Sequence, residues 1–85
     1  MYIIKFTPAA YKRFKQLDKR YQKAAKRAID RLSQNPYLGE PLTGKLKLYW
    51  KLRFSRYRII YRVEKQAVMI IIFDIRHRRD VYRFS

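Results

Sequence analysis

The spacing of apolar residues predicts one short strand followed by two helices in the first part of the chain. Residues 2–6 are β-prone and end at Thr7-Pro8, where threonine suits a helix N-cap and proline the first helical turn. Asp18 is predicted to separate the helices as a second N-cap, and Asn35-Pro36 to end the second helix. The two apolar stripes consist of Ala10, Phe14 and Leu17, and of Tyr21, Ala24, Ala25, Ala28, Ile29 and Leu32. Helices joined so tightly are expected to form a hairpin with both stripes on one surface.

The rest of the chain shows the two-residue alternation that is typical of strands. After a loop around Gly39, Pro41 and Gly44, residues 46–54 alternate. Their predicted core face consists of Leu46, Leu48, Trp50, Leu52 and Phe54. A turn at Ser55-Arg56 precedes a third strand over residues 57–63, and residues 68–75 are apolar on both faces, as expected of a central strand. The pattern leaves open whether residues 76–85 form an edge strand or a helical turn.

This element order, β-α-α-β-β-β with short connections, predicts a single α+β domain over residues 1–85. The helix hairpin is expected to pack on one face of a mostly antiparallel four-stranded sheet. Trp50, Tyr57 and Tyr61 should lie on the helix side. The opposite face should be exposed, and it carries Tyr49, Lys51, Arg53 and Arg58.

The charge balance points to a polyanionic partner. The chain has 22 Lys and Arg against 6 Asp and Glu, a formal net charge of +16. Nucleic acid, an anionic membrane surface or an acidic protein would each be attracted. Hydrophobic residues still make up 48% of the chain, which distinguishes it from a disordered basic tail.

The same composition argues against several kinds of site. There is no cysteine and a single histidine, and the six acids are scattered, so we expect no metal and no cofactor. The longest apolar stretch, residues 67–73, is far shorter than the roughly 20 residues that span a bilayer, so no membrane partner is expected. A cytoplasmic location is the default expectation.

Lys, Arg and Tyr remain as the abundant polar groups, and they can act on RNA without a metal. RNA carries a 2′-OH beside each phosphate, so an enzyme need only align it, stabilise the developing charge and manage protons. Guanidinium groups fit the phosphoryl oxygens, and a Lys or Tyr could transfer the proton. Composition alone therefore supports nucleic-acid binding and is compatible with metal-free RNA cleavage.

Three motifs give the chain a more specific likeness. They are Trp50-Lys51-Leu52-Arg53 followed by Tyr57-Arg58-Ile59-Ile60-Tyr61, the ending His77-Arg78-Arg79-Asp80-Val81-Tyr82, and the loop from Asn35-Pro36 to Gly44. In this order and spacing the chain resembles the RelE-type toxins of the RelE/ParE superfamily of toxin–antitoxin modules. The resemblance implies the same β-α-α-β-β-β fold. It also implies a ribosome-dependent endoribonuclease that cuts mRNA in the A site, leaves a 2′,3′-cyclic phosphate and a 5′-OH, and is neutralised by a cognate antitoxin.

The resemblance also implies roles for particular residues. Arg58 would be the principal phosphate and transition-state ligand, and Lys51 would have an acid–base or charge-stabilising role. Arg78 would be the second phosphate ligand, and Tyr82 would stack on or orient the scissile nucleotide.

Other assignments stay open. Tyr49 stands where the best-known branch has a further Lys, so Lys47 and Tyr49 are both alternatives for the base. Arg76 competes with Arg78 for the second arginine role, with spacing back from Tyr82 favouring Arg78. His77 is either a proton-transfer group or a supporting surface residue. Arg53 and Arg56 are further candidates for catalysis or RNA binding.

Two other functions are alternatives to RNA cleavage. One is a ParE-type toxin that poisons DNA gyrase, and the other is a non-catalytic nucleic-acid-binding module with the same basic face. Lys51 and Arg58 together with a C-terminal Arg and Tyr favour cleavage, because ParE-like members tend to lack that set.

Overall fold

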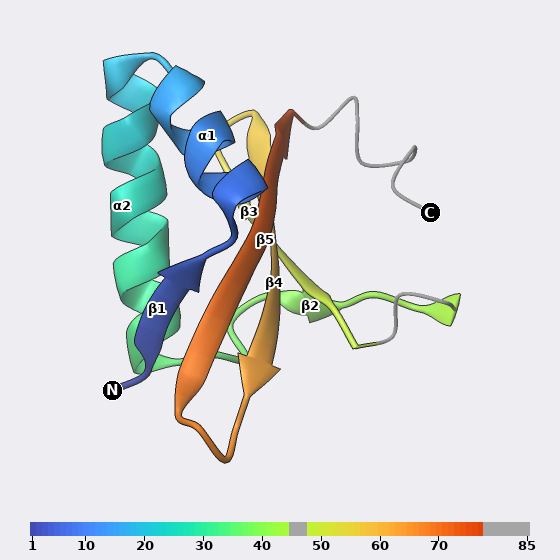
Figure 1. Cartoon of the computed structure of the whole chain (residues 1–85). Coiled ribbons are helices and arrows are strands. Elements are labelled where there is room, and N and C mark those ends of the chain that lie inside the picture. Colours follow the sequence, from blue (N-terminus) through green and yellow to red (C-terminus); the bar gives the residue numbers. More distant parts are fainter. Residues whose placement is uncertain (45–47, 78–85) are drawn as a thin grey trace.

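The computed structural model describes residues 1–44 and 48–77. Its elements are β1 (Ile3–Phe6), α1 (Pro8–Gln16), α2 (Lys19–Gln34), β2 (Glu40–Pro41), β3 (Trp50–Phe54), β4 (Tyr57–Glu64) and β5 (Met69–His77), as Figure 1 shows. The predicted order of one strand, two helices and three longer strands is therefore confirmed. The arginine and tyrosine of the C-terminal motif, Arg78 and Tyr82, lie outside the described residues, as does Lys47.

The strands form one mixed sheet in the order β1-β5-β4-β3-β2. β1 pairs in parallel with β5, and the other neighbours are antiparallel. The helices α1 and α2 cover one face of this sheet (Figure 1). The predicted α+β architecture is confirmed, with five strands in place of the expected four because the two-residue β2 pairs with β3 inside the predicted loop.

Both predicted N-caps are present. Thr7 Oγ1 accepts a hydrogen bond from the Ala10 N–H at 3.1 Å, and Asp18 Oδ1 accepts one from the Arg20 N–H at 3.3 Å. These caps satisfy amide groups that have no partner within their helix. The second helix ends at Gln34, directly before Asn35-Pro36, as predicted.

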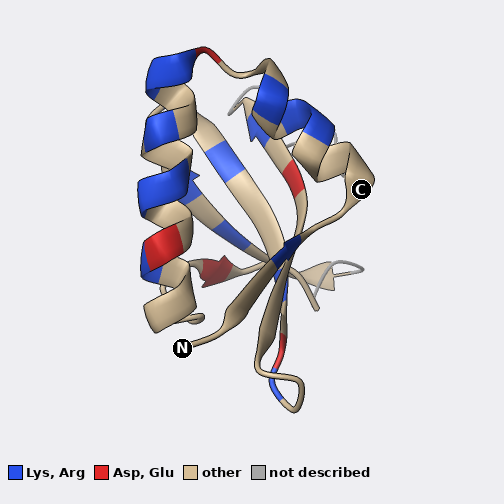
Figure 2. Cartoon of the chain, turned by 60° about the vertical axis from the view of Figure 1, so that its left-hand side comes forward, with Lys and Arg blue, Asp and Glu red and all other residues tan. Residues whose placement is uncertain are grey.

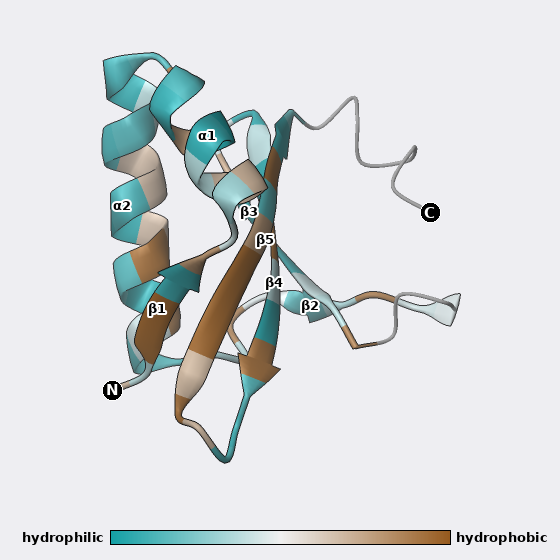
Figure 3. Cartoon of the chain, in the orientation of Figure 1, coloured by the Kyte–Doolittle hydropathy of each residue, from teal (hydrophilic) through white to brown (hydrophobic). Residues whose placement is uncertain are grey.

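The core lies between the helix hairpin and the sheet. Ala25, Ala28 and Leu32 of α2 are fully buried against it, together with Tyr61. Figure 3 shows β5 as the most hydrophobic strand, and Ile59, Ile70, Ile72 and Ile75 belong to the same buried cluster. Tyr57 contacts Tyr21 of α2 with ring centroids 5.1 Å apart, and Trp50 packs against the core, so both lie on the helix side as predicted.

The strand predicted over residues 46–54 begins later than expected. Residues 46–54 alternate, but β3 starts at Trp50, and the Leu48 side chain is 62% exposed instead of lying in the core. The registered pairing between β3 and β4 ends at Trp50–Tyr61, so Leu48 has no paired position on β4. Leu46 lies outside the described residues.

The helices carry much of the charge on their outer surfaces. Figure 2 shows Lys and Arg repeated along the side of α2 that faces away from the sheet. α2 has 16 residues, and within residues 1–44 and 48–77 no helix is long and apolar enough to cross a membrane.

Candidate active site

Three arginines occupy directly opposed positions on three neighbouring strands. Arg53 of β3 pairs with Arg58 of β4, and Arg58 pairs with Arg76 of β5. Opposed residues of antiparallel strands lie on the same face, with their Cβ atoms about 4.5 to 5.5 Å apart. Arg53, Arg58 and Arg76 therefore form a line of guanidinium groups across the sheet face away from the helices, which we name the arginine row.

The hairpin between β3 and β4 fixes one half of this row. Its loop contains two residues, Ser55 and Arg56, and Phe54 pairs with Tyr57 on either side of it. Ser55 adopts φ 52°, and such a positive φ suits a tight two-residue hairpin loop. A loop of fixed length sets the register, so Arg53 comes opposite Arg58.

A bulge in β5 brings Arg76 into the row. Ile60 pairs with Asp74 while Tyr61 pairs with Ile72, so Phe73 is the extra residue on β5. Strict alternation from the buried Ile72 would place positions 74 and 76 on the helix side. The extra residue reverses this pattern, because a bulge redirects the side chains that follow it. Arg76 consequently lies on the same face as Arg58.

Lys51 lies one step along the sheet from the arginine row. It is two residues before Arg53 and pairs with Ile60 of β4, so it shares the same face. On its other side Lys51 pairs with Glu40 of β2, and its Nζ lies 3.9 Å from Glu40 Oε2. Exposure of the Glu40 side chain is 78%, so this ion pair is strongly screened by solvent.

Arg58 is buried, in contrast to the exposed position predicted from the sequence. Its exposure is 8%, although it lies on the face away from the helices. β4 is a central strand, and the long side chains of Arg53 and Arg76 flank Arg58 on both neighbouring strands. A guanidinium that is largely removed from water interacts more strongly with an anion than an exposed one does.

A pocket of about 350 Å³ lies beside Arg58. Its lining residues are Leu38, Gly39, Glu40, Lys51, Leu52, Arg53 and Arg58. One wall thus belongs to the segment that leads into β2, and the other to β3 and β4. The pocket joins Lys51 to Arg53 and Arg58 of the arginine row in one concave surface.

Tyr61 holds the outer wall of this pocket in place. Its hydroxyl donates to the Pro36 carbonyl oxygen at 2.9 Å and accepts from the Gly39 N–H at 3.2 Å. Burial raises the pKa of Tyr61 to about 12, because the phenolate is poorly solvated there, while the Gly39 hydrogen bond acts in the opposite direction. A Cβ atom on Gly39 would lie 2.3 Å from the Lys51 carbonyl oxygen, so only glycine lets the loop approach β3 this closely.

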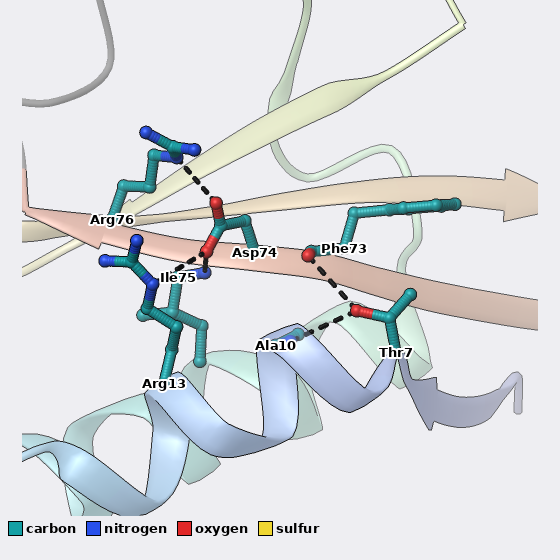
Figure 4. A network of polar contacts seen from close by, with 7 residues as sticks. All are labelled: Thr7, Ala10, Arg13, Phe73, Asp74, Ile75 and Arg76. Atoms are coloured by element: carbon teal, nitrogen blue, oxygen red, sulfur yellow. Dashed lines mark hydrogen bonds and ion pairs between the residues drawn. The ribbon is translucent and has the colours of Figure 1, made fainter. Parts of the chain in front are cut away.

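The carboxylate of Asp74 contacts two arginines. Its Oδ2 lies 2.5 Å from Arg76 Nε, and its Oδ1 lies 3.7 Å from Arg13 Nε of α1 (Figure 4). Oδ1 also accepts from the Ile75 N–H at 2.8 Å. In the sequence, Asp74 is one of six scattered acids. An acid inside an otherwise apolar central strand was the available signal.

Several predicted candidates lie apart from the row. His77 pairs with Tyr57 on the helix side, where the two rings meet edge to face at 5.4 Å. Tyr49 packs edge to face on Phe73 at 5.1 Å and lies under Arg62, whose guanidinium is 6.0 Å from the ring. Arg56 is exposed in the hairpin loop.

The described residues bring together Lys51, Arg53, Arg58 and Arg76, and they add Glu40 and Asp74, which sequence reasoning missed. Within the two described segments, no group of three or more His, Cys, Asp or Glu side chains could hold a metal ion.

A helix hairpin thus lies on one side of the sheet and a cationic row on the other. Residues 4–82 match the family model described as the ParE toxin of the type II toxin–antitoxin system parDE. The chain belongs to this family, within the RelE/ParE superfamily of toxins.

Individual relatives agree with this assignment. The chain is 31% identical to toxin RelG of Mycobacterium tuberculosis (strain ATCC 25618 / H37Rv) over 84 residues, covering 96% of this chain and 97% of the relative. The toxin–antitoxin complex RelBE2 of M. tuberculosis contains a chain with a TM-score of 0.83 and 28% identity, over 89% of this chain and 96% of that one. Isolated Escherichia coli RelE toxin shares the fold, with a TM-score of 0.81, 19% identity and full coverage of both chains.

Proposed function

We propose that this type II toxin is a ribosome-dependent, metal-free endoribonuclease that cleaves mRNA in the ribosomal A site. The observation that carries the proposal is the position of Arg58, buried between Arg53 and Arg76 with Lys51 one step away on the same face. This arrangement provides several positive charges around one point and contains a lysine that can exchange a proton. Such a site suits a phosphodiester that brings its own nucleophile.

The reaction would proceed by attack of the 2′-oxygen on the adjacent phosphorus. The 2′-OH loses its proton as the new P–O bond forms, and the bond from phosphorus to the 5′-oxygen breaks. The departing oxygen gains a proton, which gives a 2′,3′-cyclic phosphate and a 5′-OH. Arg58 would bind the phosphoryl oxygens as negative charge develops on them, since donors fixed in advance need no reorganisation during the reaction. Lys51 would stabilise charge or transfer one of the two protons.

The register favours Arg76 as the second phosphate ligand. Arg76 faces Arg58 directly, whereas spacing in the sequence favoured Arg78. Arg53 extends the row on the other side and would bind a neighbouring phosphate. We keep Arg78 for RNA binding and Tyr82 for stacking on the scissile nucleotide, on the strength of the family resemblance.

The partners in this proposal are the ribosome, its mRNA and a cognate antitoxin. Solved relatives include toxin–antitoxin complexes, RelBE2 of M. tuberculosis among them. A net charge of +16 would attract both ribosomal RNA and an acidic antitoxin segment. An antitoxin segment that covers the helices or the cationic face would keep the toxin inactive.

Primer extension on mRNA from translating ribosomes tests the proposal. Purified toxin should produce cuts positioned within codons, and excess chelator should leave them unchanged. The same assay on free mRNA, without ribosomes, shows whether the ribosome is required. Absence of cleavage on ribosomes would contradict the proposal.

A gyrase-directed toxin is the second candidate, because the matching family model is that of the ParE toxins. If the mRNA stays intact while gyrase–DNA cleavage complexes accumulate, this candidate replaces the first. Nucleic-acid binding without either effect would indicate a non-catalytic module.

A further inference from the structure

Asp74 and Arg58 are the two charged side chains that are buried in the described part of the chain. Each is 8% exposed. Asp74 of β5 pairs with Ile60 of β4, which is two residues from Arg58, so the two charges lie on the same sheet face on neighbouring strands. Burying a carboxylate is expensive unless it is paired and hydrogen-bonded. The mostly apolar β5 therefore retains a costly residue beside the arginine row.

The contacts of Asp74 are directed mainly at Arg76. The 2.5 Å contact joins Asp74 Oδ2 to Arg76 Nε, and the Arg76 side chain is 23% exposed. Arg13 lies farther away, at 3.7 Å, and its side chain is 48% exposed. Arg76 and Arg13 approach the carboxylate from opposite sides of β5 (Figure 4). The stronger and less solvated of the two contacts is thus the one with the arginine row.

We propose that Asp74 is a positioning residue that holds the Arg76 guanidinium in the orientation needed to bind the scissile phosphate. This inference rests on the proposed function. A contact at Nε fixes the plane of the guanidinium and leaves its terminal amino groups in a defined direction. An arginine side chain otherwise loses rotamer entropy when it is ordered, and without Asp74 this loss would add to the barrier for cleavage.

Asp74 also makes the row compatible with folding. Like charges at directly opposed sheet positions repel each other, and Arg58 lies between two such charges, those of Arg53 and Arg76. One carboxylate bonded to Arg76 offsets part of this repulsion without occupying the space beside Arg58. The row then keeps a net positive charge for phosphate.

A role confined to attaching α1 to the sheet explains the geometry less well. Thr7 already joins α1 to β5, because its Oγ1 donates to the Phe73 carbonyl oxygen at 3.2 Å and accepts from the Ala10 N–H (Figure 4). The Arg13 contact adds only a weak, partly solvated ion pair.

The first test detects the contact itself. In ¹⁵N spectra, the Arg76 Nε–H proton should exchange slowly with water compared with that of Arg27, which is exposed on α2. Asp74→Asn should abolish this protection. An Arg76 proton that exchanges as fast as that of Arg27 in the wild-type protein would overturn the proposal, whatever the toxin cleaves.

The second test uses single-turnover cleavage of ribosome-bound mRNA at saturating toxin. Asp74→Asn should lower the rate by about 10- to 100-fold, the scale expected for misplacement of a catalytic group, with little change in half-saturating toxin concentration. In an Arg76→Ala background the same substitution should cause no further loss. If the rate losses of the two single variants multiply in the double variant, Asp74 does not act through Arg76.

Glu64→Gln is the matched control, because Glu64 also pairs with an arginine two residues away on its own strand. Its Oε1 lies 2.8 Å from Arg62 Nη2. Cleavage should be unchanged in this variant, and an equal loss there would contradict a specific role for Asp74. Wild-type toxin that fails to cleave would refute the proposed function, while proton exchange would still decide whether Asp74 fixes Arg76.

Discussion

Arg58 of β4 faces Arg76 of β5 in direct register, and Arg58 is 8% exposed. Two like charges at such positions oppose folding. The fold tolerates them because β3, β4 and β5 are held by the apolar core on the helix side. A preorganised cationic site of this kind exchanges some stability for the ability to bind an anion as soon as it arrives.

Inorganic phosphate should therefore stabilise the protein more than chloride does at equal ionic strength. An anion that binds only the folded state at ten times its Kd adds about 1.4 kcal/mol to the free energy of unfolding. Thermal unfolding in the two salts measures the difference. Arg58→Ala should remove most of the extra stability in phosphate, whereas Arg62→Gln, on the same strand outside the row, should retain it. Equal Tm differences in all three proteins would argue against anion binding at the row.

Arg58→Ala should reduce codon-positioned cleavage by on the order of 100-fold or more, since a buried and fixed donor to the transition state is lost. The variant should remain folded, because removal of the Arg58 charge also relieves repulsion with Arg53 and Arg76. Primer extension gives the rate and circular dichroism the fold. Arg62→Gln is the control for a lost surface charge. Wild-type cleavage by Arg58→Ala would show that the site is misassigned.

Local signals in the sequence were sufficient for most of the fold. Thr7 and Asp18 cap the helices where the pattern placed them, because capping depends on residues that are adjacent in the chain. Leu48 illustrates the limit of such reasoning. It continues the alternation predicted over residues 46–54, yet its position depends on where the pairing with β4 stops.

The candidate site was harder to predict because it depends on register between strands. Residues 68–75 are apolar on both faces, and this pattern conceals the extra residue at Phe73. Without the bulge, Arg76 would be assigned to the helix side and Asp74 to the core. The choice between Arg76 and Arg78 therefore could not be made from spacing alone. Gly39 and Glu40 join the site only through contacts between the loop and β3.

Lys51→Met should reduce cleavage strongly, whereas Glu40→Gln should have little effect on stability or rate. Lys51 lies beside the row, and methionine keeps much of its apolar length while removing the charge. The Glu40–Lys51 pair is largely exposed, and such pairs contribute only about 0.2 to 1 kcal/mol. Single-turnover cleavage and urea unfolding measure the two effects. A large loss of rate in Glu40→Gln would instead give that carboxylate a direct role.

Gly39→Ala should destabilise the protein by about 1 to 3 kcal/mol, the usual range for overpacking. The added methyl group would lie 2.3 Å from the Lys51 carbonyl oxygen and 2.7 Å from Tyr61 Oη. The loop must then move away from β3, which also widens the pocket beside Arg58. Urea unfolding measures the loss, and cleavage at saturating toxin should fall with it. Unchanged stability would mean that the loop is not held against β3 in solution.

Tyr61→Phe should destabilise the protein at neutral pH and weaken the pH dependence of its stability in alkali. The substitution leaves the Pro36 carbonyl and the Gly39 N–H without the hydroxyl, and such a loss costs about 1 to 3 kcal/mol. Urea unfolding at pH 7 measures this effect. Tyr2→Phe, on a tyrosine that is only partly buried near the N-terminus, is the matched control and should change stability less.

The alkaline effect follows from the pKa of Tyr61, which burial raises from 10.0 to about 12. Between these values the unfolded chain releases the phenolic proton while the folded chain keeps it, so the folded state binds more protons. The stabilising contribution is therefore complete below pH 10 and is lost as the pH rises towards 12. Urea unfolding at several pH values should show a steeper decline for the wild type than for Tyr61→Phe. Because the two proteins differ only in this hydroxyl group, the difference between the two curves isolates Tyr61. Parallel curves would mean that the Tyr61 hydroxyl is not buried in solution and that the outer wall of the pocket is free to move.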